Sequence, residues 1–180
     1  FLVSVLNNEF AAYMCDLARI FTAKKEYKLD DWQNPDIHDT HMKSTTKDYF
    51  FPEDFNNKTL DRTDITNKTI KNIYDQINNI FTAMAKIVSK SVKLYPNIKN
   101  GFNIFGVDLM ITDQLDVILI ECNAEGTYKS KESQTHIKLE KYLFNWIDNV
   151  IFRKLFMKTH NNHDNHDNFN HSKKVFSKSI

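Results

Sequence analysis

The residues with the clearest chemical potential lie between Ile104 and Gly126, where carboxylates interrupt two apolar runs. Asp108 stands inside the first run, and Glu121 and Asn123 close the second. If residues 113–116 form a four-residue hairpin loop, Asp108 lies directly opposite Glu121, with Cβ atoms about 4.5–5.5 Å apart. Asn123, two residues beyond Glu121, then points to the same face of the hairpin.

Two facing carboxylates repel each other and lose hydration unless a positive charge lies between them. A hard divalent cation resolves this conflict, and Mg²⁺ typically takes one or two carboxylates together with substrate phosphates. Asp108, Glu121 and Asn123 offer part of such a ligand shell. The alternative is a hairpin with one solvated face, on which the carboxylates meet only water, and the spacing alone slightly favours that alternative.

Hydrophobic periodicity indicates the elements that must position these residues. The expected elements are strands at residues 1–6, 10–21, 102–112 and 116–122, a turn at 7–9, and helices at 66–95 and 131–158. The segment at 10–21 also has a helical interpretation. Asp64 or Thr66 can cap the first helix. The stretch from Lys24 to Asp64 is polar and loop-rich, and residues 159–180 form an Asn- and His-rich tail that is predicted to be disordered.

Length and composition set broad limits on the function. The chain has 180 residues, with 24 Lys and Arg against 23 Asp and Glu, so its charge indicates no nucleic-acid partner. No apolar run approaches the length of a membrane span. Cys15 and Cys122 are the only cysteines, which favours a reducing, cytoplasmic location. Because the sequence opens on Phe1 inside an expected strand, we expect the chain to be truncated at its N-terminus.

Three motifs give the chain a family resemblance. FNIFGVDLMIT, from Phe102, followed by VILIECNAEG resembles the hallmark of tubulin–tyrosine ligase-like enzymes, which reads F-x-L-F-G-x-D-F-M and then W-L-I-E-V-N-x-x-P. These enzymes are ligases of the ATP-grasp superfamily. LARIFTAKKEY, from Leu17, resembles the pattern G-L-x-R-F-A-T-x-x-Y, and IHDTHMKS, from Ile37, is similar to H-L-T-N. The resemblance spans residues 1–158.

The resemblance implies an α/β (α+β) fold, the C-terminal region of an ATP-grasp enzyme, with a mostly antiparallel sheet flanked by two long helices. It implies ATP and Mg²⁺ as cofactors, with the metal bridging the ATP phosphates. The implied site residues are Asp108, Glu121 and Asn123 for the metal, Met110 and Ile120 for the adenine pocket, Thr40 near nucleotide or substrate, and Arg19 for a carboxylate of the acceptor or amino acid. Alternation places Met110 on the Asp108 face and Ile120 on the opposite face of its own strand.

The implied activity is ATP-dependent ligation of an amino acid to a protein carboxylate through an acyl phosphate, with tubulin as the candidate acceptor and a cytoskeletal association. The chain departs from the family pattern at Asp16, Asp39, His41 and Gly126, and it carries no K-x-D-x-R segment. These departures bear mainly on the choice of amino acid and acceptor. Two alternatives stay open, namely an inactive module that binds a partner through residues 24–64, and a ligase with a different acceptor.

Overall fold

The computed structural model describes eight segments of the chain, residues 1–15, 17–22, 25–38, 45–50, 62–95, 97–124, 134–153 and 172–179. The chain divides into two compact units. Unit 1 comprises Phe1–Cys15 with Lys71–Ile180, and unit 2 comprises Asp16–Ile70. None of the helices in the described segments is long and apolar enough to cross a membrane.

The centre of unit 1 is a four-stranded antiparallel sheet. Its strands, in spatial order, are β5 (Gly101–Ile104), β1 (Leu2–Leu6), β2 (Glu9–Cys15) and β8 (Ser172–Ser179). A two-residue turn joins β1 to β2, and its residues Asn7 and Asn8 have φ angles of 52° and 63°. Asn tolerates this left-handed backbone, and such a turn matches the twist of the strands that it connects.

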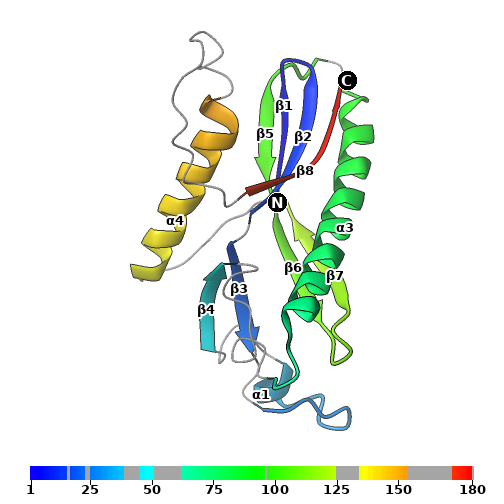
Figure 1. Ribbon diagram of the computed structural model, residues 1–180, viewed down its shortest axis with the longest axis vertical. Coiled ribbons are helices and arrows are strands. Elements are labelled where there is room, and N and C mark those ends of the chain that lie inside the picture. Colours follow the sequence, from blue (N-terminus) through cyan, green and yellow to red (C-terminus); the bar gives the residue numbers. More distant parts are fainter. Residues whose placement is uncertain are drawn as a thin grey trace. The chain divides into compact units, whose positions relative to one another are not determined.

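Both faces of the two central strands are buried, in agreement with the apolar residues at nearly every position of β1 and β2. Helix α3 (Asn67–Val92) covers one face, and its Phe81 and Ala85 are buried against alternate residues of the two strands. Helix α4 (Gln134–Ile147) and the π-helical turn η1 (Asp148–Phe152) lie against the other face. Figure 1 shows the two helices on opposite sides of the sheet. The result is a three-layer arrangement, in agreement with the predicted α/β class and antiparallel pairing.

The start of α3 confirms one of the two predicted caps. The N–H of Thr69 donates to Oγ1 of Thr66 at 3.2 Å, and the N–H of Ile70 donates to the Thr66 carbonyl at 3.0 Å. Thr66 therefore satisfies backbone donors that a helix leaves unpaired in its first turn.

The second long helix is not confirmed. Helix α4 has 14 residues, and the hydrogen bonding then widens at Asp148, where the carbonyl accepts from the N–H of Arg153. This five-residue step is that of a π turn, which inserts one extra residue into the helical repeat. Val150 and Ile151 are buried in the same cluster as Trp146, and they follow Ile147 of that cluster at the three- and four-residue spacing of a regular α-helical stripe. Residues 131–133 and 154–158 of the predicted helix lie outside the described segments.

The end of the chain also differs from its prediction. Within residues 159–180 the structure describes 172–179, and these form β8 where disorder was expected. β8 pairs antiparallel with β2, from Glu9 opposite Ser179 to Cys15 opposite Ser172. Val175 and Phe176 pack against the α3 side of the core, so this polar strand still contributes apolar contacts.

The described residues of unit 2 that precede α3 form a two-stranded antiparallel sheet and one short helix. Its strands are β3 (Leu17–Thr22) and β4 (Thr45–Phe50), and the helix is α1 (Pro35–His38). The single strand predicted at residues 10–21 is therefore wrong, because β2 ends at Cys15 and β3 belongs to a different sheet.

Candidate metal and nucleotide site

A separate two-stranded hairpin of unit 1 carries the residues singled out for their chemistry. It consists of β6 (Gly106–Ile111) and β7 (Val117–Asn123). β6 continues from β5 through Phe105, whose N–H donates to the carbonyl of Phe1 at 2.7 Å. Phe105 and Val107 pack against the cluster that includes α3, so one face of the hairpin begins inside the core.

The register of the hairpin places Asp108 directly opposite Glu121, as predicted. The loop of the hairpin differs from the prediction, because it has three residues, 113–115, in place of four. Thr112 closes it by donating its N–H to the carbonyl of Asp116 at 2.9 Å, so Ile111 is opposite Val117. The predicted register is thus wrong by one residue near the turn.

A β-bulge between Asp108 and Leu109 then shifts the pairing by one residue, which restores the predicted pair of Asp108 and Glu121. Leu109 is opposite Leu119 and Asp108 is opposite Glu121, so Ile120 has no partner in the ladder. An extra residue of this kind redirects side chains locally and interrupts strict alternation. The sequence placed Ile120 on the face of β7 opposite Glu121 by simple alternation, and this argument does not hold at a bulge.

The turn itself has an unusual backbone that several hydrogen bonds support. Leu115 has a φ of 67°, a left-handed conformation that is uncommon for a branched side chain. Its N–H donates to the Thr112 carbonyl at 3.0 Å. Gln76 of α3 donates its side-chain Nε2–H to the Leu115 carbonyl at 3.0 Å and accepts from the N–H of Val117 at 2.9 Å. The helix therefore holds the hairpin at its tip.

Asp108, Glu121 and Asn123 lie on one exposed face of the hairpin, which we call the acidic face. Asn123, opposite Gly106, donates Nδ2–H to Oε1 of Glu121 at 3.0 Å. With its nitrogen used in this way, the Asn123 amide presents its oxygen as a further ligand. The carbonyl of Ala124, next along the chain, accepts from Nδ2 of Asn103 at 3.3 Å, which anchors the end of β7 to β5.

This donor set fits a hard divalent cation that is shared with another ligand. Within the described segments no group of three or more His, Cys, Asp and Glu side chains could hold a metal by itself. The acidic face offers two carboxylates and one amide oxygen. Mg²⁺ commonly binds through one or two carboxylates while substrate phosphates and waters complete its octahedron. The acidic face thus suits a metal that arrives with a phosphate-bearing substrate.

A model of the Tubulin-tyrosine ligase family matches residues 1–154. The chain belongs to this family. No curated protein matches the chain. Members of the Tubulin-tyrosine ligase family are in general ATP-dependent carboxylate–amine ligases, which use ATP and Mg²⁺ and join amino acids to protein acceptors such as tubulin. The match contains the whole hairpin and ends before β8.

The apolar residues assigned to the adenine pocket of this family member also lie on the hairpin. Met110 is 54% exposed and stands opposite Ile118, which is 46% exposed. Met110 is two residues from Asp108 on the same strand, so the two share a face. Ile120, at the bulge, is 54% exposed. An adenine contact for Met110 and Ile120 stays a prediction.

The other two predicted site residues belong to unit 2 by their position in the sequence, whereas the hairpin belongs to unit 1. Arg19 lies in β3 of unit 2, where it is opposite Asp48. Thr40 lies outside the described segments. Their roles stay predictions.

Sequence reasoning missed Gln76, whose side chain makes two hydrogen bonds to the tip of the hairpin that carries the site. A signal for it exists, since Gln76 lies three residues after the buried Ile73 and one before Ile77, on the core-facing side of α3. A polar residue in an apolar helical stripe requires a hydrogen-bond partner.

Cys122 gives no sign of a nucleophile. Its partner in the ladder is Val107, so it lies on the face opposite the acidic one. Cys122 is exposed, but partial desolvation still raises the pKa of its thiol above the usual value, which disfavours the reactive thiolate.

Proposed function

We propose that this chain acts in the ATP- and Mg²⁺-dependent ligation of an amino acid to a protein carboxylate, with tubulin as the candidate acceptor. The observation that carries the proposal is the acidic face, where Asp108 and Glu121 are directly opposed and Asn123 is hydrogen-bonded to Glu121. Family membership supplies the reaction class.

The hairpin contributes mainly preorganisation. The strand pairing fixes the separation of Asp108 and Glu121, and Asn123 restricts the rotamer of Glu121. A metal bound there would offset the negative charge of the ATP phosphates, so that an anionic substrate carboxylate can approach. Residues already held in the required geometry lose little entropy when they bind, and phosphoryl transfer depends largely on such positioning.

The proposed reaction requires no protein nucleophile. A carboxylate oxygen of the acceptor attacks the γ-phosphorus of ATP, and ADP leaves to give an acyl phosphate. The amine of the amino acid then attacks the acyl carbon, phosphate leaves, and an amide bond forms. Arg19 would neutralise a carboxylate of the acceptor or the amino acid, Thr40 would lie near the nucleotide or substrate, and Met110 and Ile120 would contact the adenine.

A second candidate function is partner binding without catalysis. It is favoured by the exposed apolar side chains of residues 25–38 in unit 2, where Leu29 is 81% and Trp32 is 67% exposed. Large apolar side chains gathered on a surface are typical of interaction sites. This candidate requires no intact acidic face.

A ligation assay separates the two functions. The protein at its native length would be incubated with ATP, Mg²⁺, tubulin and each labelled amino acid in turn, and incorporation of label into protein would be measured. The ligase proposal expects incorporation that Asp108→Asn abolishes and that Asp75→Asn, an exposed control on α3, leaves intact. Binding of tubulin without incorporation, unchanged in both variants, would favour the second candidate.

If incorporation fails but ATP hydrolysis is observed, the acceptor differs from tubulin. Candidate acceptor proteins and peptides would then be compared by their stimulation of ATP hydrolysis, and the true acceptor should stimulate the wild type and leave Asp108→Asn unaffected.

A further inference from the structure

The chain that leaves α3 presents apolar side chains to solvent. Shortly after Val92, the last residue of α3, come Leu94, Tyr95 and Ile98, whose exposed fractions are 77%, 63% and 44%. We call these three residues the apolar tip. None of them belongs to either core cluster of the described residues. The apolar tip is therefore an apolar surface that the core of unit 1 does not use.

The backbone of the apolar tip is held by hydrogen bonds. Each of its three N–H groups donates to the carbonyl three residues earlier, at distances of 3.0, 2.9 and 3.1 Å in chain order. Just beyond the tip, Oδ1 of Asn100 accepts from the N–H of Asn7, in the turn between β1 and β2, at 3.0 Å. Side chains on a backbone that is already fixed lose less entropy when a partner covers them.

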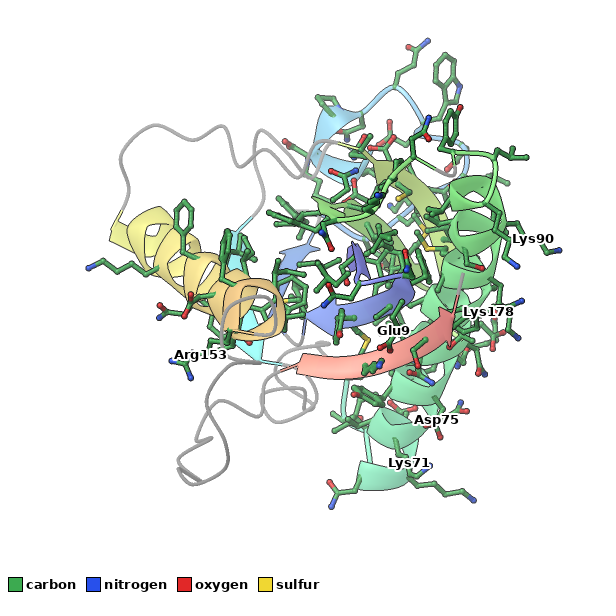
Figure 2. The ribbon with its side chains drawn as sticks, turned by 90° about the horizontal axis from the view of Figure 1, so that it is seen from above. Glu9, Lys71, Asp75, Lys90, Arg153 and Lys178 are labelled. Atoms are coloured by element: carbon green, nitrogen blue, oxygen red, sulfur yellow. The ribbon has the colours of Figure 1, made fainter. Side chains whose placement is uncertain are left out.

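The charged residues next to the apolar tip are all cations. Between Asp75 and Asp108 the sequence has no Asp or Glu, but it has four lysines, Lys86, Lys90, Lys93 and Lys99. All four are exposed, and none of them forms an ion pair within the described segments. Asp75 pairs with Lys71 at 2.6 Å, toward the other end of α3 from Lys90 (Figure 2).

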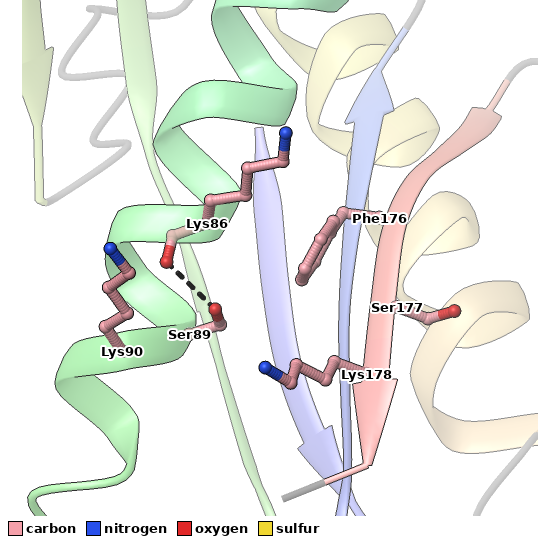
Figure 3. Close-up of a pocket in the computed structure, with 6 residues that line it drawn as sticks. All are labelled: Lys86, Ser89, Lys90, Phe176, Ser177 and Lys178. Carbon is pink, nitrogen blue, oxygen red and sulfur yellow. Dashed lines mark hydrogen bonds between the residues drawn. The ribbon is translucent and has the colours of Figure 1, made fainter.

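The elements beside the C-terminal end of α3 leave this positive charge in place. Glu9 follows the turn between β1 and β2, and its Oε1 accepts from Nζ of Lys174 at 2.8 Å. Figure 3 shows a further cation, Lys178 of β8, which extends toward α3 near Lys86 and Lys90. Apolar and cationic side chains thus occur together at this end of unit 1.

We propose that the apolar tip docks the protein on the surface of a membrane that contains anionic lipids. Leu94 and Ile98 would enter the boundary between headgroups and acyl chains, as the apolar side chains of interfacial segments do. Tyr95 suits the headgroup level, because its ring is apolar and its hydroxyl is polar. Lys93 and Lys99 would interact with the negative charges of the lipid headgroups.

A membrane fits these features better than a protein or a nucleic acid does. A protein partner must offer a surface of complementary shape, whereas a bilayer can take up projecting side chains without one. Nucleic acid would bring phosphates against Leu94 and Ile98, and the whole chain has a net charge of only +1. Because the apolar tip is small, we expect weak and reversible binding that requires anionic lipid.

Membrane docking and nucleotide binding are separable in an experiment. Val92 lies sixteen residues beyond Gln76 along α3, which is about 24 Å of helix. Substitutions in the apolar tip should therefore leave the contact between Gln76 and the hairpin intact. The docking assay contains no nucleotide, so its failure would not affect the proposed ligase function.

The test is co-sedimentation of the protein at its native length with vesicles of phosphatidylcholine and phosphatidylserine, in a ratio of about two to one. Vesicles of phosphatidylcholine alone provide the comparison. We expect binding to the anionic vesicles, little binding to the neutral ones, and weaker binding as salt is added.

One pair of variants tests the apolar contribution. Leu94→Ser with Ile98→Ser should lower the partition coefficient about fivefold or more. Its control is Leu29→Ser with Phe144→Ser, which removes apolar side chains exposed elsewhere and should change binding about twofold or less.

A second pair of variants tests the charge. Lys93→Glu with Lys99→Glu should lower the partition coefficient about tenfold or more. The charge-matched control, Lys28→Glu with Lys141→Glu, alters lysines that are exposed elsewhere and should lower it much less.

Three outcomes would overturn the proposal. The first is absence of binding of the wild type to anionic vesicles. The second is equal weakening in a tip variant and its control, which would show that overall charge or apolarity determines binding. The third is unchanged binding of the Leu94→Ser, Ile98→Ser variant, which would show that the lysines act without the apolar tip. Thermal unfolding of every variant establishes that each is folded.

Discussion

Gln76 in α3 and Val117 at the start of β7 share a hydrogen bond of 2.9 Å, although 41 residues separate them. The same Gln76 side chain also donates to the carbonyl of Leu115. The helix that covers the central sheet thus fixes the tip of the hairpin, and the acidic face is displayed on a supported element.

Replacement of Gln76 by Ala should destabilise the hairpin tip. Both hydrogen bonds are partly buried, and their loss should lower the free energy of unfolding by about 1–3 kcal/mol. Urea denaturation measures this change, and hydrogen exchange at Val117 should accelerate. Gln114→Ala, in the exposed turn, is the matched control. An equal loss of stability in the two variants would contradict the role assigned to Gln76.

Asn123 should control the affinity for Mg²⁺–ATP through Glu121. Asn123→Ala removes the amide that holds Oε1 of Glu121 at 3.0 Å, and loss of a residue that orients a metal ligand typically costs about 10–100-fold in affinity. Calorimetric titration in the presence of Mg²⁺ would measure the change, with the exposed Asn97→Ala as its control. Unaltered affinity in Asn123→Ala would remove Asn123 from the site.

Ser4 should be replaceable without loss of stability. Its hydroxyl is buried in β1, and Oγ has no hydrogen-bond partner among the residues that the structure describes. A buried polar atom without a partner carries a desolvation cost, so Ser4→Ala should leave the free energy of unfolding unchanged or raise it by about 1 kcal/mol. Ser89→Ala is the contrast, because the Ser89 hydroxyl donates to the Lys86 carbonyl at 2.9 Å. Chemical denaturation should show a loss for Ser89→Ala alone.

Cys122 should deprotonate at higher pH in the folded chain than in the unfolded chain, because burial raises its pKa. The folded state then binds more protons between the two pKa values, so stability should fall as pH rises through that interval. The rate of iodoacetamide alkylation, followed against pH in a Cys15→Ala background, gives the midpoint in each state. A folded midpoint at or below the unfolded one would refute the assignment.

The pairing of Asp108 with Glu121 could be predicted from sequence, but two compensating features hid the actual geometry. Leu115 adopts a left-handed backbone without being Gly, and the unpaired Ile120 carries no local signal of a bulge. Each shifts the register by one residue, and the shifts cancel before Asp108. A sequence can therefore predict correctly which two residues of a hairpin are opposite each other and still give the wrong register near the turn.

Elements that depend on contacts between distant parts of the sequence were harder to predict than elements that depend on neighbouring residues. The helical stripe of α3 and its cap depend on nearby residues, so the stripe was predicted correctly and the cap was narrowed to Asp64 or Thr66, of which the structure shows Thr66. β8 depends on pairing with β2, from the opposite end of the sequence, and its polar composition resembles that of a disordered tail. The π turn after α4 leaves an apolar stripe that does not differ visibly from a regular helix.

The central claim is that the acidic face binds Mg²⁺ together with ATP. The most direct measurement is calorimetric titration of ATP into the protein with and without Mg²⁺, for the wild type, Glu121→Gln and the matched exposed control Glu26→Gln. The account predicts binding that requires Mg²⁺, weakens about tenfold or more in Glu121→Gln, and is unchanged in Glu26→Gln. Binding that is independent of Mg²⁺, or equal in Glu121→Gln and the wild type, would contradict it.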